Sequence, residues 1–152
     1  MAVTNAGDIL GILDASRAVV AGVAGVNSAY VLTPNQPPSD ASLPAAIQTI
    51  FDQALGESEI TYTASQEQVD HEWYLDLLIK RSGDIQDDAK DALPFIPLVL
   101  EAYRENLTLG TSAVRDCHPR SYQIVGVTHG TNTYLAVRFR MVAKAKTAVA
   151  LN

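Results

Sequence analysis

The stretch from Tyr134 to Lys146 alternates between apolar and polar residues, which predicts a β-strand with two different faces. Its odd-numbered positions are apolar: Leu135, Val137, Phe139, Met141, Ala143 and Ala145. Its even-numbered positions include four of the eleven basic residues of the chain: Arg138, Arg140, Lys144 and Lys146. One face of this strand is therefore expected to pack in a core, while the other presents a row of positive charge.

A second alternating stretch runs from Val69 to Lys80 and predicts a long strand with one buried face. The apolar side carries Val69, His71, Trp73, Leu75, Leu77 and Ile79, and the other side carries Asp70, Glu72, Tyr74, Asp76 and Lys80. We interpret His71 as a hydrogen-bonded histidine of the core or of an interface. The neighbouring acidic residues repel phosphate, so Trp73 and Tyr74 are interpreted as core plus interface rather than as a base-stacking pair.

Helical spacing of apolar residues predicts two helices. Asp8 is a suitable N-cap for the first helix, which is expected to end near Gly22 or Gly25. The second helix spans "SGDIQDDAKDALPFIPLVLEAYREN", where Pro94 and Pro97 are expected to kink or restart it. Four carboxylates fall on its first turns, where they favour the helix dipole and face water, although the same spacing can bind a cation: Asp84, Asp87, Asp88 and Asp91.

The remaining segments complete an α+β pattern. "NSAYVLTP" predicts a short strand, residues 34–44 an exposed proline-rich loop that reaches outward, and residues 45–52 a further strand. Three apolar-rich runs after "NLTLGT" predict three strands, the last two forming a hairpin through Gly130. The predicted order is α-β-β-β-α-β-β-β, with two helices packed on a largely antiparallel sheet.

Composition fits one globular domain over residues 1–152, since 47% of the residues are hydrophobic and 18% are charged. No export signal or membrane span is evident, because Asp14 and Arg17 interrupt the first apolar segment. The lone Cys117 excludes an intramolecular disulfide and fits a protein made in a reducing compartment.

No common catalytic or nucleotide-binding motif occurs in the chain, so we expect no catalytic residue, cofactor or metal site. The nearest reactive cluster is Cys117 and His118, with His129 close in sequence. Adjacent residues on a strand point to opposite faces, so Cys117 and His118 are not expected to pair. A buried cysteine beside a loop histidine is the simpler interpretation.

The charge is divided unevenly along the chain. Residues 1–112 carry 5 basic and 16 acidic side chains, whereas residues 113–152 carry 6 basic and 1 acidic. The acidic remainder disfavours nucleic acid and membrane as partners of the basic face. Two interpretations stay open: the charges protect the strand from aggregation, or they contact an acidic surface of a neighbouring subunit. The candidate interface residues are Arg138, Arg140, Lys144, Lys146, Trp73 and Tyr74.

Several stretches resemble the tail-terminator proteins of long-tailed, siphovirus-like bacteriophages. The resemblance is carried by "EWYLDLLIKRSGD", "DALPFIPLVLEAYRENLTLG" and "TYLAVRFRMVAKAK", over about residues 69–146. "VAGVNSAYVLTP" and the proline-rich loop are also similar to the first helix, strand and connection of that family, whereas "AAIQTIFDQALGESEITYT" fits poorly.

This resemblance implies a non-enzymatic virion protein of the tail and neck, assembled in the cytoplasm of the host bacterium. The family forms a six-fold ring that caps the tail tube, ends its polymerisation and docks to the head-completion protein of the neck. Such a ring leaves a channel through which double-stranded DNA passes without sequence-specific binding. The alternatives are a head-completion or connector protein, a monomeric binding module, and a small enzyme using Cys117 or His118.

Overall fold

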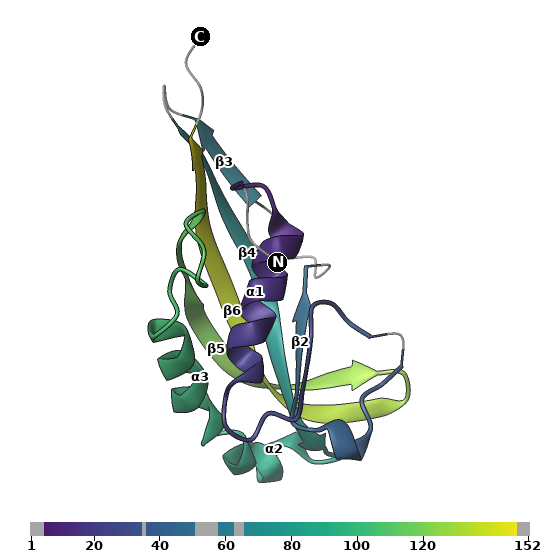
Figure 1. Cartoon of the computed structure of the whole chain (residues 1–152). Coiled ribbons are helices and arrows are strands. Elements are labelled where there is room, and N and C mark those ends of the chain that lie inside the picture. The colour runs from purple at the N-terminus through teal and green to yellow at the C-terminus, as the bar shows by residue number, and fades with distance from the viewer. Residues whose placement is uncertain (1–4, 35, 51–57, 63–65, 149–152) are drawn as a thin grey trace.

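The computed structural model describes residues 5–34, 36–50, 58–62 and 66–148. Its helices are α1 (Ile9–Ala21), α2 (Ile85–Asp88) and α3 (Phe95–Arg104), with 3-10 turns η1 (Asp40–Ser42) and η2 (Ala89–Asp91). Its strands are β1 (Ser28–Tyr30), β2 (Ala45–Thr49), β3 (Ser58–Tyr62), β4 (Gln66–Arg81), β5 (Val114–His129) and β6 (Asn132–Ala148). The arrangement is the predicted α+β class, with helices on a largely antiparallel sheet (Figure 1).

The sheet has the strand order β1-β2-β4-β6-β5, and β3 pairs with β4 beyond the end of β2. Only the β1–β2 pair among these ladders is parallel. The central strands β4 and β6 pair from Gln66 to Arg81, with one register shift between Leu78 and Lys80. Together with β3, the paired ends of β4 and β6 extend past the helices as an arm (Figure 1).

Helix α1 begins and ends where its capping residues predict. The carboxylate Oδ1 of Asp8 accepts a hydrogen bond from the backbone N–H of Gly11 at 2.9 Å, and Gly22 follows the last helical residue. Ile12, Leu13 and Val20 are buried against the sheet. The prediction of an amphipathic first helix is confirmed.

The second predicted helix is divided into α2, η2 and α3, as its two prolines suggested. Pro94 is the N-cap residue of α3, and Pro97 lies in the first turn of that helix. The N–H groups of a first turn have no partner within the helix, so a proline there costs no hydrogen bond. The expected restart is therefore confirmed, at the position that tolerates proline.

Within the described residues there are six strands, the number predicted, but their distribution along the chain differs. The expected strand over 45–52 is β2, which ends at Thr49, and residues 51 and 52 lie outside the described part. β3 was not predicted. The three strands expected after residue 106 are two, because "VRDCHPRSYQIVGVTH" forms one strand. Register shifts next to Asp116 and Pro119 interrupt the alternation that would have revealed it.

The proline-rich loop over 34–44 was expected to be exposed and to reach outward; half of its described residues are exposed, but the outward course is wrong. Gln36 and Pro37 are exposed, but Pro38 and Leu43 are buried. The hydroxyl of Tyr134 on β6 donates to the carbonyl oxygen of Pro38 at 2.8 Å. The loop therefore folds back over one end of the sheet, where it closes a small second core.

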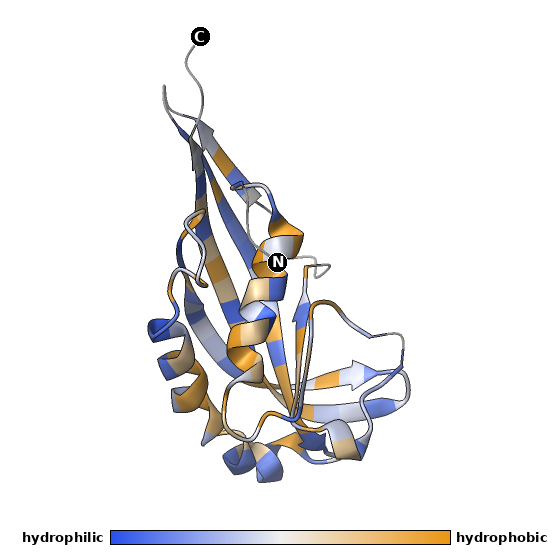
Figure 2. Cartoon of the chain, viewed as in Figure 1, coloured by the Kyte–Doolittle hydropathy of each residue, from blue (hydrophilic) through white to orange (hydrophobic). Residues whose placement is uncertain are grey.

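The main core lies between the sheet and the helices, and the alternation of apolar and polar residues along the long strands is visible in Figure 2. Inside it, Gln48 connects three elements through its side-chain amide. Its Nε2 donates to the carbonyl oxygen of Leu13 at 2.7 Å, and its Oε1 accepts from Nε1 of Trp73 at 3.1 Å. Both polar side chains are fully buried, and these bonds satisfy them.

We predict that Gln48→Leu lowers the free energy of unfolding by about 2 kcal/mol, because the buried indole N–H of Trp73 then lacks an acceptor. Trp73→Phe removes that donor, so the double variant should cost about 1 kcal/mol less than the sum of the single variants. Urea unfolding of the four proteins measures this coupling. Additive costs would show that the bond contributes nothing.

Candidate functional site: the open face of the sheet

The sheet has one face packed by α1 and α3, here called the helix side, and an opposite open face. The odd-numbered apolar residues of β6 lie on the helix side, as predicted. The even-numbered residues of β6, and those of β4 up to the register shift after Leu78, lie on the open face, where register places Asp76 opposite Arg138 and Asp70 opposite Lys144. The basic residues of β6 are thus matched by acidic residues of the adjacent strand in the same chain.

Arg138 is held by the strongest of these contacts. Its Nε and Nη2 donate to the two carboxylate oxygens of Asp76 at 2.8 and 3.0 Å. Its guanidinium also lies over the ring of Tyr74, 4.6 Å from the centroid. The Asp76 side chain is only 4% exposed and that of Arg138 23%, so this bidentate pair is largely withdrawn from water.

A more exposed cluster lies next to that pair. Glu72 accepts from Nη2 of Arg140 at 3.0 Å and from Nη1 of Arg120, on β5, at 3.1 Å. One carboxylate therefore connects the two strands that flank β6. Because both guanidinium groups remain in contact with water, these bonds contribute less to stability than the Asp76 pair does.

The two lysines extend the row toward the arm. Lys144 is exposed and lies between Asp70 of β4 and Asp116 of β5 in the strand register. Lys146 lies opposite Gln68 and is half-buried. The predicted row of basic residues on one face is confirmed, but its charge is balanced locally, so a separate acidic surface is not needed to compensate for it.

An open pocket of about 710 Å³ occupies this face at the level of the arm. Its acidic residues come from β3 and β4, and they include Glu59 and Asp70. Its basic residues Arg120 and Lys144 come from β5 and β6, as does His118. The pocket thus has an acidic side and a basic side, which suits a ligand or a protein surface carrying both signs of charge.

Two aromatic residues were predicted as core plus interface, and the structure separates them. Trp73 is fully buried on the helix side, so its side chain is not a surface contact. Tyr74 is half-buried on the open face, where the guanidinium of Arg138 lies over its ring. The strand alternation dictates this division, because neighbouring residues point to opposite faces.

The cysteine and histidine residues do not form a reactive cluster. Cys117 lies in the helix-side core, where burial raises the pKa of its thiol, so the nucleophilic thiolate is disfavoured. His118 lines the open-face pocket, its Nδ1 3.1 Å from Oδ1 of Asp116. His129 packs edge-on against Tyr134 at the far end of β5. The expectation that Cys117 and His118 do not pair is confirmed, whereas the interpretation of His118 as a loop residue is wrong, because it lies within β5.

His71 is the buried, hydrogen-bonded histidine that its position predicts. Its Nε2 lies 2.7 Å from the carbonyl oxygen of Ala6 and donates to it. The backbone N–H of Ala6 in turn donates to Oγ1 of Thr147 at 2.5 Å. His71 therefore fastens the segment before α1 to the arm, which is a structural role.

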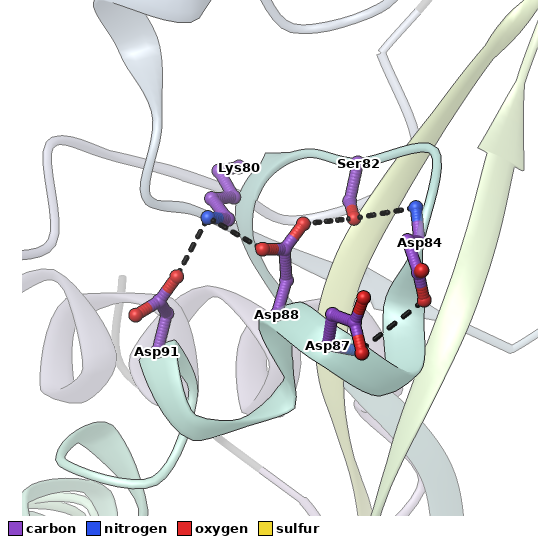
Figure 3. A network of polar contacts seen from close by, with 6 residues as sticks. All are labelled: Lys80, Ser82, Asp84, Asp87, Asp88 and Asp91. Atoms are coloured by element: carbon purple, nitrogen blue, oxygen red, sulfur yellow. Dashed lines mark hydrogen bonds and ion pairs between the residues drawn. The ribbon is translucent and has the colours of Figure 1, made fainter.

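Two of the four acidic residues at the start of the second helical segment, Asp88 and Asp91, contact Lys80 (Figure 3). Nζ of Lys80 lies 2.6 Å from Oδ2 of Asp91 and 3.2 Å from Oδ1 of Asp88. Oγ of Ser82 donates to Oδ2 of Asp88 at 2.6 Å, and Oδ1 of Asp84 accepts from the N–H of Asp87 at 3.2 Å. The Lys80 ammonium thus occupies the position that a bound cation would take.

Among the described residues, histidine, cysteine and carboxylate side chains do not gather in threes where they could hold a metal ion. None of the helices in that part of the chain is long and apolar enough to cross a membrane.

The chain matches no protein-family model, and it has no significant sequence similarity to a curated protein.

Sequence reasoning identified the basic residues of this face but not their partners Glu72 and Asp76. The signal was present, because three of the four even-numbered residues from Asp70 to Asp76 are acidic and four of the five from Arg138 to Lys146 are basic. Pairing two strands of opposite charge is favourable. Only the register was lacking, and it depends on the whole antiparallel ladder.

We predict that Arg138→Met destabilises the protein by about 3 kcal/mol, because it leaves the Asp76 carboxylate buried without its partner. The matched variant Arg140→Met should cost at most about 1 kcal/mol, since Glu72 keeps Arg120 and is more accessible to water. Denaturant unfolding under identical conditions compares the two. Equal losses would mean that burial of the Asp76 pair has no energetic weight.

A pH dependence follows from the network around Asp88. The Ser82 hydroxyl and the Lys80 ammonium lower the pKa of Asp88 below its ordinary value of 3.8. The folded state therefore binds fewer protons than the unfolded state near that pH, so this contribution to stability is full above 3.8 and is lost as the pH falls through the lowered pKa.

We expect the free energy of unfolding of the wild type to decrease through this acidic window, and that of Asp88→Asn to decrease less steeply. Asp87→Asn, which leaves the contacts of Lys80 intact, is the control and should keep the wild-type slope. Thermal or urea unfolding between neutral and acidic pH gives the three slopes. Parallel curves for all three proteins would contradict the assignment.

Proposed function

We propose that this protein is a structural component of a bacteriophage virion, a tail terminator of the long-tailed phages that it resembles. Copies of the chain form a ring, with six subunits as in that family, which caps the tail tube and ends its polymerisation. The opposite side of the ring is the docking face for the neck. The protein acts without catalysis, cofactor or metal, and it is assembled in the cytoplasm of the host bacterium.

Its partners in this proposal are other copies of itself, the major tail tube protein and the head-completion protein of the neck. Double-stranded DNA passes through the lumen of the ring without sequence-specific contacts. The acidic balance of the chain, with a net charge of −6, supports this, because a surface of that sign does not hold the phosphate backbone.

The observation that carries the proposal is that the three sequence stretches that resemble the family pack against one another in the structure. "EWYLDLLIKRSGD" lies mainly on β4, "DALPFIPLVLEAYRENLTLG" contains α3, and "TYLAVRFRMVAKAK" lies on β6. β4 and β6 are hydrogen-bonded neighbours, and α3 contributes Ile96 and Val99 to the core that they share. The segments that resemble the family are thus separate in sequence but form one packed part of the structure.

A monomeric binding module is the second candidate, favoured by the open-face pocket with its acidic and basic sides. A head-completion or connector protein of the neck stays an alternative within the same assembly. An enzyme using Cys117 receives no support from the position of that residue in the core.

The test combines native mass measurement with negative-stain imaging of the purified protein, alone and mixed with tail tubes. We expect a ring, and tubes whose ends are capped and no longer elongate when tube protein is added. Rings that bind heads but never tubes would identify a neck connector instead. A strict monomer that leaves tube growth unchanged would refute the proposal and leave the binding module.

A further inference from the structure

Among the described residues, the outer edges of β1, β3 and β5 lack a partner strand, and that of β1 is only three residues long. At one side of the sheet β5 pairs only with β6, and at the other side β3 pairs only with β4. An unpaired edge presents backbone N–H and C=O groups that can hydrogen-bond to another strand. Natural proteins usually protect such edges with charges, prolines or bulges, so an edge without these features indicates that another strand covers it.

The two halves of β5 differ in this protection. The first half contains Arg115, Pro119 and Arg120 and both register shifts, and the N–H of Cys117 already donates to the carbonyl oxygen of Leu107 at 2.7 Å. The second half, "SYQIVGVT" over 121–128, contains no charged residue and no proline. This half is rich in residues that favour strands, and Tyr122 is 52% exposed. It therefore resembles a strand edge that another strand covers.

The free edge of β3 has the complementary character. Ile60 is 55% exposed and Tyr62 67%, although the hydroxyl of Tyr62 hydrogen-bonds to Glu67. In the strand register Ile60 lies opposite Val69, whose side chain is in the helix-side core. The apolar residues of β3 therefore belong to the helix side of the sheet, where they extend past the helices that cover the rest (Figure 1).

The two edges match face by face. On β5, Tyr122 lies opposite Phe139, so it too is on the helix side. On the open face, β3 carries Glu59, and the uncharged half of β5 is preceded by Arg120, which reaches over that face to Glu72. A continuous sheet would thus place apolar residues beside apolar ones on one face, and opposite charges on the other.

We propose that the β3 edge of one copy of this chain pairs with the 121–128 edge of β5 in the next copy. β3 runs antiparallel to β4 and β5 runs parallel to β4, so β3 and β5 run in opposite directions. When neighbouring copies have the same orientation, the β3 edge of one and the β5 edge of the next therefore meet as an antiparallel pair. The contact is head-to-tail, since different surfaces of identical subunits meet. It rests on the proposed ring, for which it supplies the subunit contact.

A symmetric alternative joins β5 to β5 of a second copy around a two-fold axis. That arrangement covers Tyr122 but leaves Ile60 and Tyr62 of both copies exposed. The head-to-tail contact covers both edges with a single type of interface. β3 lies at the level of the arm, whereas residues 121–128 lie nearer the other end of the sheet. Each copy in the ring is therefore displaced along the strand direction relative to its neighbour, so the strands are inclined to the ring axis.

Cysteine cross-linking tests the contact directly. Thr61 of β3 and Gln123 of β5 both belong to the open face and are exposed, and β4 and β6 separate them within one chain. Three strand spacings amount to about 14 Å, beyond the reach of an intramolecular disulfide. The native Cys117 is kept in all variants, because it is buried in the core and cannot reach the introduced cysteines.

We expect the variant with both Thr61→Cys and Gln123→Cys to give covalent dimers, trimers and larger species after mild oxidation. Each single variant should remain monomeric on a denaturing gel, because Thr61 does not face Thr61. Thr61→Cys with Ser121→Cys samples the adjacent position on the same face of β5. Cross-linking of Gln123→Cys alone would identify the symmetric contact and overturn the proposal.

Native mass separates failure of this inference from failure of the proposed ring. Rings with no cross-link in either double variant would refute the edge contact and leave the ring standing, whereas monomers at all concentrations would refute both. As a second measurement, Tyr122→Lys should weaken self-association roughly tenfold or more, because the charge would be buried between strands. Leu98→Lys, on an exposed position of α3, is the matched control and should leave association unchanged.

Discussion

The antiparallel pairing of β4 with β6 is the constraint on which the rest of the structure depends. It joins residues that are 53 positions apart in sequence at one end (Arg81 and Tyr134) and 82 at the other (Gln66 and Ala148), and it runs from the arm to the opposite end of the sheet. Once this register is set, the alternation of side chains assigns every residue of both strands to a face. The helix-side core, the row of charge pairs on the open face and the protruding arm all follow from that single alignment.

The faces of the long strands could be predicted from the sequence, and so could the start and end of α1 and the restart at Pro94. These features depend on local patterns, namely a period of two, a capping aspartate and prolines at the first turn. β3 and the continuity of β5 could not be predicted in this way. β3 is only five residues long, and its two faces can be assigned only from its pairing with β4. In β5, the bulges shift the alternation of apolar and polar residues by one position.

The open face illustrates how tertiary context changes the meaning of a charge pattern. In sequence, Arg138 and Arg140 are part of a basic segment that follows a long acidic one, which suggests attraction between separate molecules. In the folded chain, Asp76 and Glu72 lie within hydrogen-bonding distance of them. The division of charge along the sequence is therefore matched within the sheet itself, because the native alignment of β4 with β6 places opposite charges side by side.

The register shift between Leu78 and Lys80 has a consequence for the whole length of β4. Before it, even-numbered residues such as Asp76 belong to the open face. After it, Lys80 lies level with Leu135 of the helix side and reaches the carboxylates of Asp88 and Asp91. The register of the strand, and not the chemistry of the side chain, thus decides on which face of the sheet each residue lies. A one-residue deletion at this point would preserve almost every amino acid of the strand while exchanging the surroundings of those that follow.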